Sequence, residues 1–158
     1  MKRSIFLFIS LSISLLLSGI LVNAQVNNVS DCNDHHINAT LVNTNAALED
    51  AGFQLVYTKM MTSYPKTITT QQIAIEAGKI YQLNFILPAD YKNIRISFIN
   101  QKKEEIFKER LKGKDGLKKV FNKTFTATQS GNYWLVLDIS TPNNAPACTG
   151  ISVLSINQ

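Results

Sequence analysis

The chain has 158 residues, a formal net charge of +5, and only two cysteines and two histidines. A chain of this length fits one domain and is long enough to bury about two thirds of its unfolded surface. No segment repeats, has low complexity or resembles a linker, which excludes repeat and multidomain architectures.

The first 24 residues have the three parts of a secretory signal peptide. Lys2 and Arg3 give a positive start, residues 5–16 form an apolar run, and the Val-Asn-Ala sequence at 22–24 is a small-residue cleavage site. We therefore expect cleavage near Ala24, a secreted or periplasmic location, and no transmembrane segment in the mature chain. A retained signal anchor is the alternative.

The two cysteines, Cys32 and Cys148, lie near the two ends of the mature chain. Because an exported chain enters an oxidising compartment, we expect them to form a disulfide. In the chain-entropy model a bridge that closes so long a loop contributes about 4–5 kcal/mol at most. It would tie the N-terminal segment to the last strand.

One amphipathic helix is predicted within residues 25–52. Ser30 or Asp31 is the candidate N-cap, and Gly52 is the candidate C-terminal stop. The residues that share one helical face are Ile37, Leu41, Thr44 and Leu48.

The start of this helix, DCNDHHINAT at 31–40, contains residue types that bind metals. In the predicted helix Cys32 and His36 share one face, and Asp31 and His35 share a neighbouring face. A zinc site needs three or four converging ligands, and the chain has no further histidine and no HExxH or CxxC spacing. We interpret the segment as the polar start of a helix, and we expect no metal and no cofactor. A small metal-dependent hydrolase centred on His35 and His36 stays as an alternative.

The rest of the chain, residues 53–158, has the two-residue hydrophobic period of β-strands. Eight segments show it: 53–61, 67–77, 80–88, 94–100, 104–111, 119–127, 133–140 and 148–156. In the first of them Phe53, Leu55 and Tyr57 are predicted to face inward. Short strands with no helix between them indicate antiparallel pairing. We therefore predict an antiparallel, jelly-roll-like β-sandwich with the N-terminal helix packed on it.

Trp134, the only tryptophan, is out of phase with Tyr133, Leu135 and Leu137, so it is predicted to face away from the main core. It could pack beneath the helix or serve as a platform for a sugar. We favour the helix contact, because the helix must bury its apolar face against a sheet.

Positive charge is concentrated in residues 108–123, where seven lysines and arginines face only Glu109 and Asp115. Such a cluster attracts phosphate, sulfate or carboxylate groups, although lysines are also common on solvated hairpins. No aromatic residues are interleaved in the way that single-stranded nucleic acid requires, so we expect no nucleic acid partner. The candidate polyanion contacts on the predicted hairpin are Arg110, Lys112, Lys114, Lys118 and Lys119.

Two segments within residues 67–140, AGKIYQLNFILPADYKNIRISFIN and FTATQSGNYWLVLDIS, resemble bacterial pre-peptidase C-terminal domains and the wider group of GOLD-like jelly-roll sandwiches. The resemblance implies a sandwich fold and an accessory, non-catalytic role, and it carries over no active-site residue. This chain departs from the pattern by lacking a peptidase domain and by adding a helix and a cysteine pair. The residues at matching positions are Gly78, Tyr81, Phe125, Gly131 and Tyr133.

The sequence therefore predicts an exported, non-catalytic binding module. Its expected partner is another exported protein or an anionic polysaccharide or lipid surface. A structural or inhibitory partner of another exported protein, acting through exposed strand edges, is a further alternative.

Overall fold

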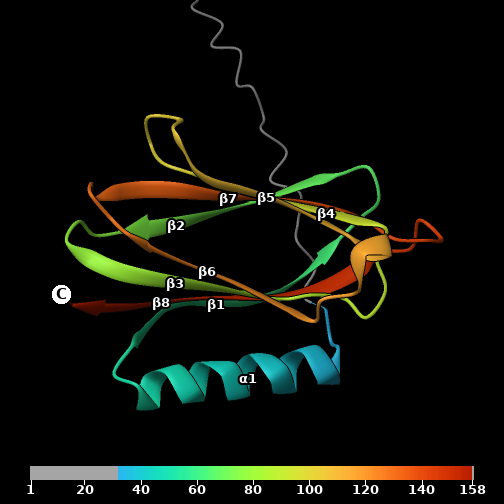
Figure 1. Cartoon of the computed structure of the whole chain (residues 1–158), viewed down its shortest axis with the longest axis horizontal. Coiled ribbons are helices and arrows are strands. Elements are labelled where there is room, and N and C mark those ends of the chain that lie inside the picture. The colour runs from blue at the N-terminus through green and yellow to red at the C-terminus, as the bar shows by residue number, and fades with distance from the viewer. Residues whose placement is uncertain (1–31, 158) are drawn as a thin grey trace, which may run out of the picture.

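Two four-stranded antiparallel sheets face each other and enclose the core (Figure 1). The computed structural model describes residues 32–157, so the predicted signal peptide lies outside the described residues. The strand order is β1-β8-β3-β6 in the first sheet and β2-β7-β4-β5 in the second. This order is that of a jelly roll, which confirms the predicted fold. The strands are β1 (Gln54–Ser63), β2 (Ile68–Ile75), β3 (Lys79–Ile86), β4 (Asn93–Ile99), β5 (Glu105–Lys112), β6 (Val120–Thr126), β7 (Gly131–Ser140) and β8 (Ala147–Asn157).

The core lies between the two sheets and follows the predicted alternation. On β7, Tyr133, Leu135, Leu137 and Ile139 are buried, while the residues between them are half-exposed. Phe98 of β4 is fully buried, and its ring centroid lies 5.4 Å from that of Tyr133. The predicted alternation therefore places the aromatic core correctly.

Strand β1 departs from its prediction. Its register against β8 shifts between Leu55 and Tyr57, and Leu55 is 42% exposed. The prediction that Leu55 faces inward is therefore wrong, because the irregularity between Leu55 and Tyr57 places these two side chains on opposite faces of the sheet. Further along β1, Met61 and Ser63 are buried.

Helix α1 (His35–Asp50) covers the outer face of the first sheet and contacts β8, β1 and β3 (Figure 1). Ile37 and Leu41 pack on Ile86 of β3. Gly150 of β8 lies beneath them, where an added Cβ would stand 3.0 Å from Cγ2 of Ile37. The glycine therefore lets the helix approach the sheet closely. No helix among residues 32–157 has the length and apolar character needed to cross a bilayer.

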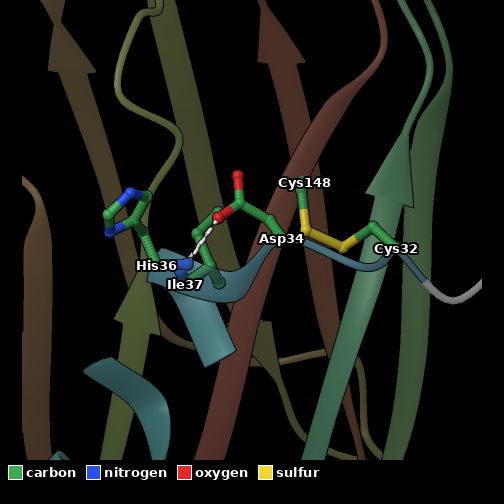
Figure 2. The surroundings of a disulfide bond; sticks show 5 residues. All are labelled: Cys32, Asp34, His36, Ile37 and Cys148. Carbon is green, nitrogen blue, oxygen red and sulfur yellow. Dashed lines mark hydrogen bonds between the residues drawn. A yellow bond between two sulfur atoms is a disulfide. The ribbon is translucent and has the colours of Figure 1, made fainter. Parts of the chain in front are cut away.

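The helix begins later than predicted. Asp34 is the N-cap, and its Oδ1 accepts hydrogen bonds from the backbone N–H of His36 at 2.9 Å and of Ile37 at 3.1 Å (Figure 2). The prediction that Ser30 or Asp31 caps the helix is therefore wrong. A short carboxylate at the residue before the helix satisfies two N–H groups that have no partner within the helix.

The C-terminal end of the helix matches its prediction. Gly52 has φ +92, and its N–H donates to the carbonyl of Glu49 while the N–H of Phe53 donates to that of Leu48. This pair of bonds is a Schellman motif, which favours glycine because the chain enters the left-handed region.

The predicted disulfide between Cys32 and Cys148 is present, with a Cα–Cα distance of 5.6 Å (Figure 2). Cys32 lies in the extended segment just before α1, and Cys148 lies on β8. The bridge therefore fixes the start of the helix to the sheet that the helix covers.

Candidate anion-binding surface

The predicted basic hairpin does not exist. β5 belongs to the second sheet and β6 to the first, and residues 113–119 cross from one sheet to the other at the end of the sandwich (Figure 1). Consecutive strands often pair, but jelly-roll connections cross between the sheets. The prediction that the five cations share one hairpin is therefore wrong.

Three of the five predicted cations nevertheless meet. Arg110 and Lys112 at the end of β5 and Lys118 in the following connection line one hollow of about 150 Å³. Asp115 and Tyr91 also line this hollow. Three cations and one carboxylate leave an excess of positive charge, so the hollow favours an anion.

Backbone hydrogen bonds hold this connection in place. Lys118 N–H donates to Tyr91 Oη at 3.0 Å, and Gly113 N–H donates to the Lys92 carbonyl at 3.0 Å. The N–H of Leu87 donates to the Lys119 carbonyl at 2.8 Å. The backbone that carries the cations, the end of β5 and the connection after it, is therefore fixed, which lowers the entropy cost of binding a ligand.

Gly113, at the start of this connection, permits a close approach of two backbones. An added Cβ there would collide with the carbonyl oxygen of Tyr91. Only glycine fits without a shift of the backbone, so Gly113 is part of what positions the basic loop.

Arg95 extends the cationic surface, and no feature of the sequence alone places it there. Arg95 on β4 stands directly opposite Arg110 on β5. Like charges directly opposite each other destabilise a sheet, but each arginine has a polar partner that offsets this. Arg110 Nε donates to Asn93 Oδ1 at 2.6 Å. A carboxylate oxygen of Asp138 lies 3.5 Å from the guanidinium of Arg95. The two arginines are far apart in the sequence, and only the pairing of β4 with β5 brings them together.

Lys123 does not join this surface, although it lies in the basic segment. Its Nζ lies 3.0 Å from Oε1 of Glu109. This ion pair links β6 to β5, the two edge strands on one side of the sandwich. Lys123 therefore pairs across the edges of the two sheets, and it does not line the hollow.

Lys119 and Lys114 lie apart from the hollow. Lys119 lines another hollow of about 450 Å³ beside the start of α1, together with Asp34 and His36. Lys114 is exposed in the 3-10 helix η1 (Gly113–Asp115). The five predicted contacts thus divide into a group of three and two outlying lysines.

His35 and His36 are both exposed, and their ring centroids lie 6.2 Å apart. Cys32 precedes the helix, so the prediction that Cys32 and His36 share a helical face is wrong. Within residues 32–157 no three His, Cys, Asp or Glu side chains gather in a way that could hold a metal ion. Asp34 is occupied by capping, so the geometry gives no support to a hydrolase centred on these histidines.

Trp134 faces out of the second sheet, opposite Gln72 on β2 and Ile99 on β4. The prediction that Trp134 faces away from the core is confirmed. The prediction that it packs beneath the helix is wrong, because α1 covers the other sheet. A role in stacking on a sugar stays a hypothesis.

A groove between α1 and the first sheet was not predicted. It has a volume of about 490 Å³ and is lined by uncharged polar groups, including Thr40 and Thr44 of the helix and the amides of Gln82, Asn84 and Asn122. Helix–sheet packing creates it, so no local sequence signal could have shown it.

The connections at the two ends of the sandwich differ in charge. We call the end formed by residues 64–67, 87–92, 113–119 and 141–146 the basic end; it carries five lysines and two aspartates. We call the opposite end, formed by residues 76–78, 100–104 and 127–130, the neutral end; it carries two lysines and two glutamates. The lysines of the basic end are Lys66, Lys92, Lys114, Lys118 and Lys119.

Comparisons with known proteins give no family for this chain. No protein-family model and no curated protein matches the chain. Solved structures of similar shape include a pre-peptidase C-terminal domain of a Bacillus anthracis collagenase, which is 11% identical with a TM-score of 0.48 and covers 63% of this chain and 89% of that one. A CBM4 structure is 16% identical with a TM-score of 0.44, and the match covers 66% of this chain and 79% of that one. The lectin domain of lectinolysin complexed with Lewis B antigen is 16% identical with a TM-score of 0.34, and the match covers 63% of this chain and 72% of that one.

These similarities are low, so we transfer no ligand and no residue role from them. A pre-peptidase C-terminal domain is among the structures found, as the sequence resemblance predicted. The strand order of the chain itself identifies it as a jelly-roll β-sandwich.

Proposed function

We propose that this protein is an exported, non-catalytic binding module that contacts a polyanion through its basic end. The proposal rests above all on the convergence of Arg110 and Lys112 from β5 and Lys118 from the following connection on one hollow. Hydrogen bonds fix that connection. Lys114 and Lys119 flank this hollow along the chain and extend the positive field.

The free energy of binding is expected to come from relief of repulsion between these cations. They lie close together, and Asp115 is the only acidic residue that lines the hollow. An incoming phosphate, sulfate or carboxylate group lowers this repulsion and forms charge-assisted hydrogen bonds. Because exposed charges are screened over about 8–10 Å at physiological salt, the affinity should fall steeply as salt rises.

The test is a matched pair of charge-reversed double variants. Lys112→Glu with Lys118→Glu changes the basic end, and Lys102→Glu with Lys103→Glu changes the neutral end. Both variants lower the net charge equally, so a difference in binding reports position and not total charge. We expect the first variant to lose its retention on immobilised heparin at low salt and the second to keep most of it.

Two outcomes would contradict the proposal. Equal losses in the two variants would mean that heparin responds only to net charge. No retention of the unchanged protein at low salt would remove the polyanion and leave recognition of a partner protein. Thermal unfolding of both variants provides the control for folding, since exposed substitutions usually change the free energy of unfolding by only about 0.5 kcal/mol.

A further inference from the structure

We propose that the polyanion is the surface of an anionic lipid bilayer, and that Leu117 enters the bilayer interface while the surrounding lysines contact lipid phosphates. This inference rests on the proposed function and narrows it from any polyanion to a lipid surface.

Leu117 is 49% exposed although it is a large apolar residue. It lies in the connection between β5 and β6, directly before Lys118 and Lys119 and three residues after Lys114. An apolar side chain within a group of lysines is the composition expected where a protein meets a charged lipid interface.

The loop does not fold Leu117 away from water. Hydrogen bonds fix it on both sides, at Gly113 and at Lys118. The Cδ2 of Leu117 is near Gly113, where an added Cβ would lie 3.3 Å from it. The structure thus supports one side of Leu117 and leaves the rest in solvent, which costs free energy unless another apolar phase covers it.

Within residues 32–157, large exposed hydrophobic residues in connections between strands occur only at the basic end. The other large exposed hydrophobic residues of this range lie on the helix or on strands, and the two in connections are Tyr64, 46% exposed, and Leu117. Tyrosine is enriched at membrane–water interfaces because its ring is apolar and its hydroxyl is polar. Both residues therefore extend the basic end in a way that suits lipid.

A soluble polysaccharide explains the lysines but not the leucine. Sulfated or carboxylated sugars offer charge and hydroxyl groups, and an aliphatic side chain gains little from them. A bilayer offers phosphate groups and an apolar layer below them, so it matches both features. Asp115, in the same connection, is repelled by an anionic surface and should weaken the binding.

The experiment measures co-sedimentation with vesicles of phosphatidylcholine, alone or mixed with phosphatidylglycerol, and retention on heparin. The variants are Leu117→Ser and, as a matched control, Val42→Ser, since Val42 is 56% exposed on α1 and lies outside the basic end. We expect the unchanged protein to bind only the anionic vesicles. We expect Leu117→Ser to weaken that binding by about three- to tenfold, the value for covering about half of a leucine side chain, and to leave heparin retention unchanged.

The outcomes separate this inference from the proposed function. Retention on heparin without binding to anionic vesicles would overturn the inference and keep the proposed function. Equal effects of Leu117→Ser and Val42→Ser on vesicle binding would also overturn it. Binding to neither heparin nor vesicles would overturn both. Asp115→Asn should strengthen vesicle binding, and a weakening would contradict the contact between this loop and the lipid.

Discussion

The basic end and the neutral end of the sandwich are built alike but charged differently. At the basic end the N–H of Lys118 donates to the hydroxyl of Tyr91, and at the neutral end the N–H of Glu76 donates to the hydroxyl of Tyr81. Both tyrosines are buried at 2% exposure. A buried tyrosine thus fixes a connection at each end, whereas the excess of lysine occurs at one end only.

This comparison separates what the fold requires from what it tolerates. The neutral end shows that a jelly-roll end can be closed without an excess of lysine. An excess of lysine is therefore not a general requirement of the fold, which is consistent with a role of the basic end in binding.

The largest expected effect is the loss of the covalent link at the basic end. Replacing Cys32 and Cys148 together by serine should lower the free energy of unfolding by about 2–4 kcal/mol. The bridge fixes the start of α1, so amide hydrogen exchange should rise first at Ile37 and not at the neutral end. Equal protection of the Ile37 amide in the variant and the unchanged protein would contradict this prediction, and so would faster exchange at the neutral end. Urea unfolding provides the free energy.

A glycine at each end gives the next comparison. Gly113→Ala places a methyl group against the carbonyl of Tyr91 and should cost about 3 kcal/mol through overpacking. Gly78 has φ +82 and open space around it, so Gly78→Ala should cost only about 1 kcal/mol of backbone strain. Urea unfolding measures both values. Retention on heparin should fall for Gly113→Ala alone, and an equal loss in Gly78→Ala would contradict the placement of the site.

The two loop-fixing tyrosines give a smaller and more selective effect. Tyr91→Phe and Tyr81→Phe each remove the acceptor of one backbone N–H, so each should cost about 1 kcal/mol of unfolding free energy. Only Tyr91→Phe should also weaken heparin binding, because only Tyr91 fixes the loop with the cations. If both variants bind heparin as well as the unchanged protein, the hydrogen bond to Lys118 does not position the site.

The smallest effect is a pH dependence that belongs to the neutral end. Burial raises the pKa of Tyr133, with smaller contributions from Tyr81 and Glu104, and its hydroxyl donates to the Gln129 carbonyl at 3.0 Å. Because the pKa of Tyr133 is higher in the folded than in the unfolded state, its protonated hydroxyl contributes to the free energy of unfolding. This contribution is complete below about pH 10 and is lost as the pH rises through the folded pKa. Tyr133→Phe should therefore flatten the alkaline decline in unfolding free energy. Urea titrations at about pH 9 and about pH 11 measure it, and equal declines would contradict this assignment.

Local sequence patterns predicted a large part of this fold. The two-residue alternation in β7 placed Tyr133 and Leu135 in the core and Trp134 outside it, because the pleat sends successive side chains to opposite faces. Gly52 marked the end of the helix, because a left-handed residue favours glycine. The predicted disulfide followed from the number of cysteines and the expected compartment.

The candidate site could be predicted only in part. The sequence located the excess of lysine in residues 108–123, but a run of charges does not show which strands pair. The hairpin was wrong because the chain crosses between sheets after Lys112. Arg95 was missed because it joins Arg110 only through the pairing of β4 with β5.

The sequence by itself determined the local properties of this protein: strand alternation, the helix with its glycine stop, the cysteine pair and the basic segment. These depend on neighbouring residues, through pleat geometry, backbone sterics and charge. Only the tertiary structure decided which sheet the helix covers, which cations share a hollow and that Leu117 stays in solvent. Those properties depend on contacts between residues far apart in the chain, and several arrangements of the same strands satisfy the same local pattern.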